Sequence, residues 1–331
     1  MNSTQPPNDR PRIGLITNPH SRRNRAALAD VEAMLKAHNN IRHYITRSED
    51  EISLALQTFS EQDVQIVAIN GGDGTTTQIF AALLNASPFD VPPTVVLLPG
   101  GTTNMNAADT GMRGKLKASI RLLCRWSDGE TIRTQELYRP ILRVDGAIGH
   151  DALYGMFFGA GTIIRGIEYC KTRVHRVGLI NEIGPGVALL RALWGILCGD
   201  PKFAAPVDAY IRLAERGDAP ERQLVILLVS SLERLFLGMR PWWGSEQQPL
   251  HCTWVQKPTY KLLRKLPGLL RGKPPASATP ENGYFSHNTL QIELDMDATF
   301  TIDGELFQAS REHGPIRVSH GGAIKFLKIG P

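Results

Sequence analysis

The sequence predicts an α/β domain built on a parallel sheet, followed by a second domain that is mostly β. Up to about residue 126, continuous apolar runs alternate with helical patterns, as in parallel sheets whose strands are buried on both faces. Beyond residue 130, short strand-like runs follow one another with few helical patterns between them, which is typical of a β-sandwich. A chain of 331 residues is also long enough for two cores.

Three regions follow from these patterns. Residues 1–11 are polar and rich in proline, without the apolar core of a signal peptide, so we expect a disordered lead-in. Residues 12–129 form the expected α/β domain, which ends near a polar Ser-Asp-Gly-Glu turn. Residues 130–331 form the expected β-sandwich domain, whose last strands could return to the first domain.

In the first domain, strand and helix patterns take turns along the chain. Strands are predicted at 12–17, 41–46, 64–70 and 94–98, and helices at 22–38, 49–62, 76–84 and 115–126.

In the second domain, we expect strands at 131–137, 140–144, 152–158, 207–213, 223–230, 250–256, 289–294 and 299–303. Residues 168–197 read as mostly helical, and residues 258–271 as a basic, leucine-rich excursion.

Three strands of the first domain end in small, polar or turn-forming residues, at 18–21, 71–75 and 99–104. In a doubly wound sheet these segments would gather at the carboxyl edge, where ligands bind. The second segment, Gly-Gly-Asp-Gly-Thr, lies between an apolar strand and a helix. Glycines there let the backbone approach a ligand, and the helix start presents N–H groups to an anion. The sequence therefore predicts a phosphate-binding turn.

Asp73 places a carboxylate in this turn. Beside bound phosphates a carboxylate is repulsive unless it holds a metal ion, accepts a proton or orients a hydroxyl. Its presence favours phosphoryl transfer over passive anion binding. The alternative is an ordinary strand-to-helix turn with an aspartate near the N-cap.

The composition limits the class of protein but does not identify its function. The chain is 42% hydrophobic and 21% charged, with a net charge of +5, as expected for a globular protein that does not require nucleic acid. The four cysteines are widely separated, which favours a reducing compartment. No apolar run reaches the roughly 20 residues of a membrane span.

The ordered set of motifs resembles the diacylglycerol kinase catalytic-domain family of lipid kinases, which includes bacterial diacylglycerol, sphingosine and ceramide kinases. The resemblance covers nearly the whole chain after Arg12. The segments that carry it are Asn18-Pro19, the unchanged signature at 71–75, the second glycine loop at 101–104, the glycine turn at 158–161 and the late Asp-Gly-Glu motif at 303–305.

The resemblance implies transfer of the γ-phosphoryl group of ATP, with Mg²⁺ bound to the nucleotide, to a lipid hydroxyl. It implies that the first domain binds the nucleotide, the second binds the lipid, and the active site lies in the cleft between them. Asp303 would be the base, with Glu305 supporting it or the metal, and Asp73 is the rival base. The implied nucleotide-binding residues are Asn18, Gly71, Gly72, Gly74, Thr75, Gly101, Thr102 and Asn104.

The chain departs from the family pattern in three places. Arg22-Arg23 and Met105-Asn106 replace residues that are common in the two nucleotide loops, so nucleotide contacts could differ there. Many bacterial relatives carry an Asp-rich segment for a structural magnesium ion. The corresponding region here has Glu246 as its single carboxylate, so that metal site is not carried over and its metal ligands stay unknown.

Alternative interpretations stay open at this point. Asp303-Gly304 could be a plain hairpin turn, and Gly159 and Gly161 could mark only a bulge in a strand. The Gly-Gly-Asp-Gly signature is shared with NAD kinases, so an NAD kinase-like enzyme for small molecules, or a non-catalytic regulator that binds nucleotide or lipid, are the competing functions. Among lipid acceptors, diacylglycerol competes with ceramide and other long-chain lipid alcohols.

A lipid acceptor implies a cytoplasmic enzyme that associates peripherally with the inner face of the membrane. We expect the basic, leucine-rich segment at 258–273 to meet an anionic membrane surface. An ordinary solvated helix is the competing interpretation. Whether the chain forms a homodimer stays open. The cations proposed for membrane contact are Lys261, Arg264, Lys265 and Arg271.

Overall fold

The computed structural model describes residues 10–101, 104–164, 206–214, 217–218, 222–235, 238–259 and 262–330. Thr102, Lys261 and the helix expected at 168–197 lie outside these residues. The chain divides into two compact units: Met1–Arg139 together with Ala323–Pro331, and Pro140–Gly322. We describe each unit by itself.

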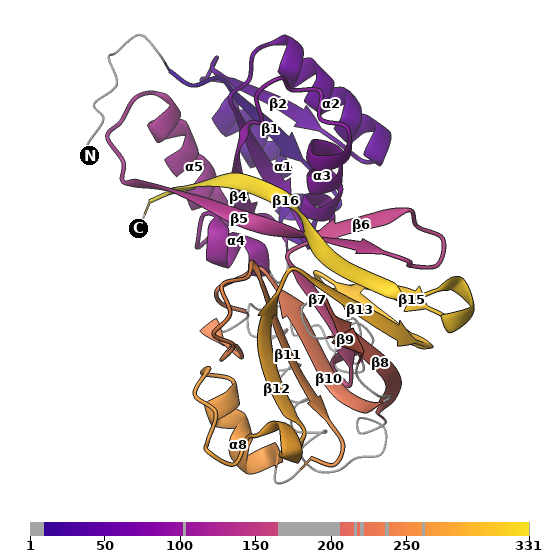
Figure 1. Cartoon of the computed structure of the whole chain (residues 1–331). Coiled ribbons are helices and arrows are strands. Elements are labelled where there is room, and N and C mark those ends of the chain that lie inside the picture. The colour runs from indigo at the N-terminus through magenta and orange to yellow at the C-terminus, as the bar shows by residue number, and fades with distance from the viewer. Residues whose placement is uncertain are drawn as a thin grey trace. The chain divides into compact units, whose positions relative to one another are not determined.

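The first unit is built on a parallel sheet with the strand order β4-β3-β1-β2 (Figure 1). Its central strands are buried along their length, because helices cover both faces. The strand β16 joins this sheet at β4, where Phe326 pairs with Val95 in parallel. The bounds are β1 Ile13–Thr17, β2 Ile41–Ile45, β3 Ile66–Gly71, β4 Thr94–Pro99 and β16 Ile316–Ile329.

The helices of this unit pack on opposite faces of the sheet (Figure 1). On one face, α1 and α5 share a core with alternate residues of the strands, such as Leu15 and Ala68. On the other face, Phe59 of α2 fills the space above Gly14, where a Cβ would come within 2.4 Å of its ring. The bounds are α1 Arg22–Leu35, α2 Glu49–Glu61, α3 Asp73–Asn85, α4 Met105–Thr110 and α5 Leu116–Ser127.

The second unit is mostly antiparallel. Inward-facing residues of its strands form a separate core that includes Phe158, Leu227, Ile292 and Phe300. A short helix, α8 (Leu262–Leu269), lies in the excursion between β11 and β12. The strand bounds are β5 Thr134–Asp145, β6 Ala152–Gly155, β7 Phe157–Gly161, β8 Val207–Leu213, β9 Gly217–Asp218, β10 Arg222–Ser230, β11 Leu250–Gln256, β12 Tyr284–Thr289, β13 Gln291–Met296, β14 Ala298–Ile302 and β15 Glu305–Ala309.

The predicted fold class is confirmed: a parallel α/β unit is followed by a mostly antiparallel β unit. Two strands contain residues of both units. The strand β5 belongs to the first unit up to Arg139, and β16 pairs with β13 through residues of the second unit and with β4 through residues of the first.

Several details differ from the sequence prediction. The helix α4 and the strands β9, β12, β15 and β16 were not expected, and the strand predicted at 152–158 is divided between β6 and β7. The runs at 131–137 and 140–144 belong to the single strand β5, which continues through Pro140. The expected glycine turn at 158–161 is wrong: these residues lie in the strand β7, which pairs with both β10 and β14. Gly161 has a φ of +82° there, and a Cβ would come within 2.5 Å of the Val225 oxygen, so the glycine serves a close backbone approach.

Candidate functional site

The two glycine loops of the first unit meet at the carboxyl ends of β3 and β4. A Cβ placed on Gly101 would lie 2.7 Å from the Gly72 Cα. Gly100 is equally confined, since its Cβ would lie 2.5 Å from Asn70 Oδ1. Side chains are therefore excluded from the contact between the loops, and the backbone forms the surface. The predicted turns at 71–75 and 99–104 are brought together as expected for neighbouring parallel strands.

The loop that follows β1 is tied by side-chain hydrogen bonds to the glycine loop at 71–75, which follows β3. Asn18 Nδ2 donates to Thr75 Oγ1 at 2.8 Å, and the Gly72 N–H donates to Ser21 Oγ at 3.0 Å. Thr75 is buried, so its hydroxyl positions the loop. A Cβ on Gly71 would come within 2.6 Å of Thr75 Cβ. These contacts hold the predicted phosphate-binding turn in one conformation.

Asn104 closes the second loop on itself. Its Oδ1 accepts the Gly101 N–H at 2.7 Å and its Nδ2 donates to the Gly101 oxygen at 2.9 Å. Asn104 also adopts a left-handed conformation, with φ of 49°, which asparagine tolerates better than most residues. Arg23 adds a guanidinium hydrogen bond to the Pro99 oxygen at 3.2 Å. Thr102, predicted to bind nucleotide, lies outside the described residues.

A buried polar network beneath the loops was not predicted. Asn24 is fully buried on α1, and its Nδ2 donates to the Asn18 oxygen at 2.7 Å and the Asn70 oxygen at 2.8 Å. Asn70 Nδ2 in turn donates to Thr17 Oγ1, which also contacts His43 Nε2 at 2.9 Å. Desolvation lowers the pKa of His43, against a smaller opposing effect of nearby Glu32. Asn24 lies on the same face of α1 as its buried apolar residues, so the helical period of the sequence could have indicated that Asn24 is buried.

The amino end of α3 presents backbone donors beside these loops. Its N-cap residue is Gly72, so no side chain caps the first N–H groups of the helix, and those groups are suited to bind anions. Gly74 lies in this first turn. Asp73, the first residue of the helix, places a carboxylate at the same end, where the helix dipole stabilises negative charge. The arrangement suits a phosphate group accompanied by a divalent cation.

Asp303 is the buried carboxylate of the second unit. Its Oδ1 accepts the Phe157 N–H at 2.9 Å, and its Oδ2 accepts the Met156 N–H at 3.1 Å. The side chain packs where Gly155 leaves space, since a Cβ there would come within 2.9 Å of Asp303 Oδ2. Two backbone donors therefore fix the orientation of the carboxylate.

The same residue is also the first of a two-residue hairpin turn. Asp303 and Gly304 have φ values of 49° and 93° between β14 and β15, as in a type I′ turn. The hairpin interpretation is therefore correct for the backbone, while the burial of the carboxylate goes beyond what a turn requires. Glu305 is exposed at the start of β15. The roles of Asp73, Asp303 and Glu305 stay predictions.

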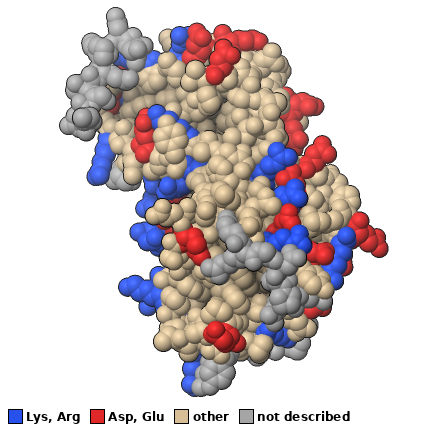
Figure 2. Space-filling view, in the orientation of Figure 1, with Lys and Arg blue, Asp and Glu red and all other residues tan. Residues whose placement is uncertain are grey.

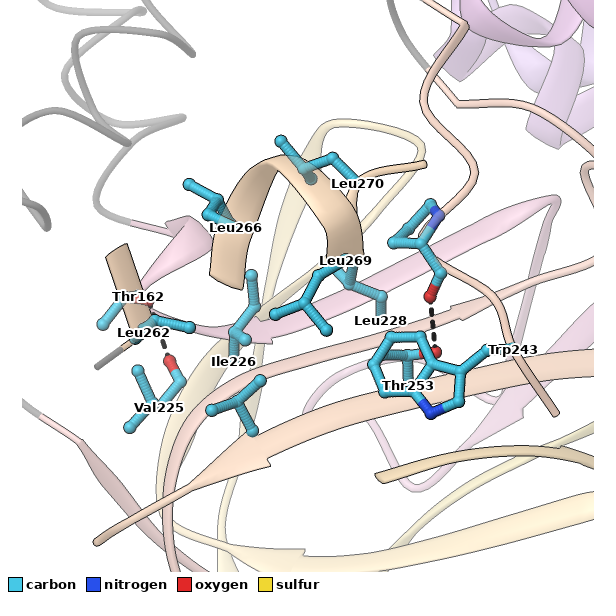
Figure 3. A pocket seen from close by; sticks show the side chains of 12 residues that line it. Thr162, Val225, Ile226, Leu228, Trp243, Thr253, Leu262, Leu266, Leu269 and Leu270 are labelled. Atoms are coloured by element: carbon cyan, nitrogen blue, oxygen red, sulfur yellow. Dashed lines mark hydrogen bonds between the residues drawn. The ribbon is translucent and has the colours of Figure 1, made fainter. Parts of the chain in front are cut away.

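An apolar pocket lies beneath α8 in the second unit (Figure 3). It encloses about 60 Å³. Since a single water needs about 10–15 Å³ on this scale, the pocket has the room of roughly four to six water molecules. Leu262, Leu266, Leu269 and Leu270 line this pocket, so these four leucines do not form an outward apolar face. Its lining includes Val225, Ile226, Trp243, Leu262, Leu266 and Leu269.

One of the cations proposed for membrane contact is not on the surface. Lys265 is only 4% exposed, its Nζ donates to the Ser277 oxygen at 2.5 Å, and it lies 4.3 Å from the centre of the Tyr284 ring. Burial raises the pKa of Tyr284 to about 12. The prediction for Lys265 is therefore wrong, because a buried ammonium cannot meet lipid headgroups. Arg264 and Arg271 are exposed, and Lys261 lies outside the described residues.

Glu246 anchors a loop to the strand β12. Its Oε1 contacts His287 Nδ1 at 2.8 Å, and its Oε2 accepts the Asn288 N–H at 2.9 Å. Partial desolvation acts to raise the pKa of Glu246, but these partners outweigh it and the pKa falls to about 2. Within the described residues, no group of three or more His, Cys, Asp or Glu is arranged to hold a metal ion. In the same part of the chain, no helix is long and apolar enough to cross a membrane.

Comparison with known proteins adds a family match and a fold match. Residues 12–133 match the family model of the diacylglycerol kinase catalytic domain. No curated protein matches the sequence. Among solved structures, the chain is similar to a diacylglycerol kinase from Bacillus anthracis str. Sterne, at 17% identity and a TM-score of 0.57, with 97% of each chain covered. Two further structures from that organism, to which the same activity is assigned provisionally, each share 18% identity and 97% coverage of both chains, with TM-scores of 0.62 and 0.60.

Proposed function

We propose that this chain transfers the γ-phosphoryl group of ATP to the hydroxyl of a membrane lipid. The match of residues 12–133 to the family model of the diacylglycerol kinase catalytic domain supports a kinase for a lipid or small molecule. The observation that carries the proposal is the contact between Gly72 and Gly101 beside the uncapped amino end of α3. Two side-chain-free loops next to helix N–H groups form a cradle for a polyphosphate.

In this proposal the chain positions the nucleotide with few charged side chains. The first N–H groups of α3 bind phosphate oxygens, and Ser21, Asn18 and Asn104 keep the two loops in place. Asp73 is the residue that would hold Mg²⁺, which supplies charge neutralisation at the phosphates. Phosphoryl transfer needs mainly alignment and charge stabilisation from the protein, and this site fits that need.

Asp303 is proposed as the base that takes the proton from the acceptor hydroxyl. Two backbone N–H groups fix its carboxylate, so a proton acceptor is held without the entropic cost of a mobile side chain. Asp73 remains the alternative base, and Glu305 is proposed to support the site from the start of β15.

The apolar pocket beneath α8 supports a lipid acceptor over a polar small molecule (Figure 3). A buried space lined by leucine, isoleucine, valine and tryptophan side chains suits the end of an acyl chain. Diacylglycerol, ceramide and other long-chain lipid alcohols all carry such a chain, so the pocket favours the class without selecting among them. An acceptor of this kind would bring the enzyme to the inner face of the membrane.

The test is a transfer assay with labelled ATP and a panel of acceptors: diacylglycerol, ceramide, sphingosine and NAD. We expect label on at least one lipid and none on NAD. Transfer to NAD alone would assign the small-molecule alternative. Binding of ATP and lipid without turnover, with Mg²⁺ or Mn²⁺ present, would assign the regulator.

A pocket variant tests the lipid part separately. Leu266→Trp places an indole in the pocket, and we expect it to lower turnover of long-chain acceptors at least tenfold while a short-chain soluble analogue is phosphorylated normally. The matched control is Leu290→Trp, at an exposed leucine outside the pocket. Equal losses on both acceptors would argue against an acyl-chain pocket.

A further inference from the structure

Three cations converge on the last turn of α4 in the first unit. Arg113 Nε donates to the Ala108 oxygen at 2.9 Å, and Lys328 Nζ donates to the Asp109 oxygen at 2.7 Å. Arg139 Nε lies 3.4 Å from Asp109 Oδ2. The three side chains come from the loop after α4, from β5 and from the end of β16, so the fold itself assembles them.

The cluster carries more positive charge than its surroundings neutralise. Asp109 is its one carboxylate, and this side chain is 8% exposed and contacts Arg139. Within the described part of the chain, neither Arg113 nor Lys328 has a carboxylate at ion-pair distance. Desolvation lowers the pKa of Lys328, and the charges of Arg113 and Arg139 lower it further, against the opposing effect of Asp109. Two positive charges thus remain uncompensated.

A purely structural role explains only part of this arrangement. Cations near the carboxyl end of a helix are stabilising, and one of them would satisfy the exposed carbonyls of so short a helix. Bringing three cations together adds mutual repulsion, and helix capping by one of them does not compensate for it. Repulsion of this kind is relieved when an anion binds between the cations.

We propose that Arg113, Arg139 and Lys328 bind a phosphate group, carried either by a phospholipid headgroup or by a soluble phosphate compound. Guanidinium groups match phosphate oxygens in pairs, and the ammonium adds a point charge. Arg113 is exposed and Lys328 is half-buried, so the cluster is open on one side. Figure 2 shows Lys and Arg atoms gathered where Figure 1 places α4 and α5.

The site differs from the nucleotide cradle. Asn104 precedes α4 and the cluster lies at the other end of this helix, about 9 Å further along at 1.5 Å per residue. It also uses charged side chains, whereas the cradle uses backbone donors. The proposal therefore does not depend on the kinase activity.

The test compares Arg113→Gln/Lys328→Gln with the wild type in two binding assays. The first is co-sedimentation with phosphatidylcholine vesicles that contain phosphatidylglycerol. The second is the rise in melting temperature that sodium phosphate causes relative to sodium chloride at equal ionic strength. The matched control is Arg42→Gln, at an exposed arginine on β2 at the opposite edge of the sheet.

We expect the double variant to lose about fivefold in vesicle binding for each cation removed, or to lose part of the phosphate-induced shift, while Arg42→Gln behaves as the wild type. Loss in the vesicle assay alone assigns a lipid headgroup, and loss in the phosphate assay alone assigns a soluble phosphate. Without ligand, Arg113→Gln alone should melt no lower than the wild type, because repulsion is removed while Lys328 still donates to the Asp109 oxygen.

A lower melting temperature without ligand, together with unchanged binding in both assays, would overturn the proposal in favour of helix capping. Equal losses in Arg42→Gln would overturn it in favour of a diffuse charge effect. If the double variant does not fold, Arg113→Gln alone serves, since this side chain is exposed. Lys328→Arg keeps the charge and should keep binding. Transfer to a short-chain soluble acceptor should be unchanged, which separates this result from a failure of the kinase proposal.

Discussion

Gly72 and Gly101 lie so close that a Cβ on Gly101 would come within 2.7 Å of the Gly72 Cα, whereas a Cβ on Gly72 has no neighbour closer than 3.8 Å. Because of this asymmetry, a substitution at Gly72 should affect ATP binding alone, whereas one at Gly101 should affect stability as well. Gly72 has φ of −89°, which any residue adopts, so Gly72→Ala should melt as the wild type does but bind ATP at least tenfold more weakly, because its methyl group faces the phosphate cradle. Gly101→Ala should lose both stability and binding. Calorimetry of unfolding and ATP titration measure the two effects, and normal ATP binding by Gly72→Ala would argue against the cradle.

Asn24 gives the second prediction. Asn24→Leu leaves the oxygens of Asn18 and Asn70 without this buried donor, at a cost of about 1–3 kcal/mol for an unpaired buried group. Because Asn18 also positions Thr75, the KM for ATP should rise as well. Asn40→Ala is the control, since it removes a hydrogen bond to the Ser127 oxygen away from the loops. It should lower the melting temperature slightly and leave the KM unchanged. Equal KM values in both variants would make Asn24 a purely structural residue.

The sequence predicted the first unit well because its signals are local. Strands such as β3 and β4 are buried on both faces, so they appear as continuous apolar runs whatever their partners. The strand β16 was missed because Gly321-Gly322 interrupts its pattern and its register is set by β13 and β4 from distant parts of the chain. The helix α4 has only six residues, too few to show a helical period.

The loops of the candidate site were predicted from the sequence, but the contacts that hold them and the Asp303 carboxylate in place were not. Gly72 and Gly101 were found from the motifs, but their contact depends on the neighbouring strands. The Asp303 turn was visible as Asp-Gly, yet the burial of its carboxylate depends on N–H groups of Met156 and Phe157, about 147 residues earlier in the chain. Lys265 reads as surface charge in a basic segment, and only the packing against Tyr284 shows that it is buried.

The third prediction concerns the two carboxylates. Asp303→Asn and Asp73→Asn should each reduce turnover by about 10²–10⁴-fold, the usual cost of losing a positioned base. Asparagine keeps the left-handed turn at position 303 but offers one acceptor oxygen fewer, so a small loss of stability should accompany the first change. Asp151→Asn, at an exposed position of the second unit, is the control. Near-normal turnover in Asp303→Asn would remove it as the base and leave Asp73.

The fourth prediction is a pH dependence. The pKa of Glu246 falls from 4.5 to about 2 in the folded protein, so its ionised form stabilises the fold fully above pH 4.5, and this contribution is lost as the pH falls towards 2. Glu246→Gln should therefore melt below the wild type at neutral pH, and the difference should shrink between pH 4.5 and 2. Glu312→Gln, at an exposed site, should show no such convergence. A constant difference across this range would mean that the contacts with His287 and Asn288 do not depend on the charge.

The last prediction separates surface from buried cations in the basic segment. Arg264 and Arg271 are exposed, and each could contribute about 1 kcal/mol on an anionic membrane, so Arg264→Gln/Arg271→Gln should bind phosphatidylglycerol vesicles several-fold more weakly with an unchanged melting temperature. Lys265→Ala should do the reverse, because it removes a buried side chain that packs on Tyr284 and donates to the Ser277 oxygen. Co-sedimentation and thermal unfolding of both variants check the contrast. Vesicle binding that stays at the wild-type level in the arginine variant would make this segment an ordinary solvated helix, since Leu262, Leu266, Leu269 and Leu270 already line the pocket beneath α8.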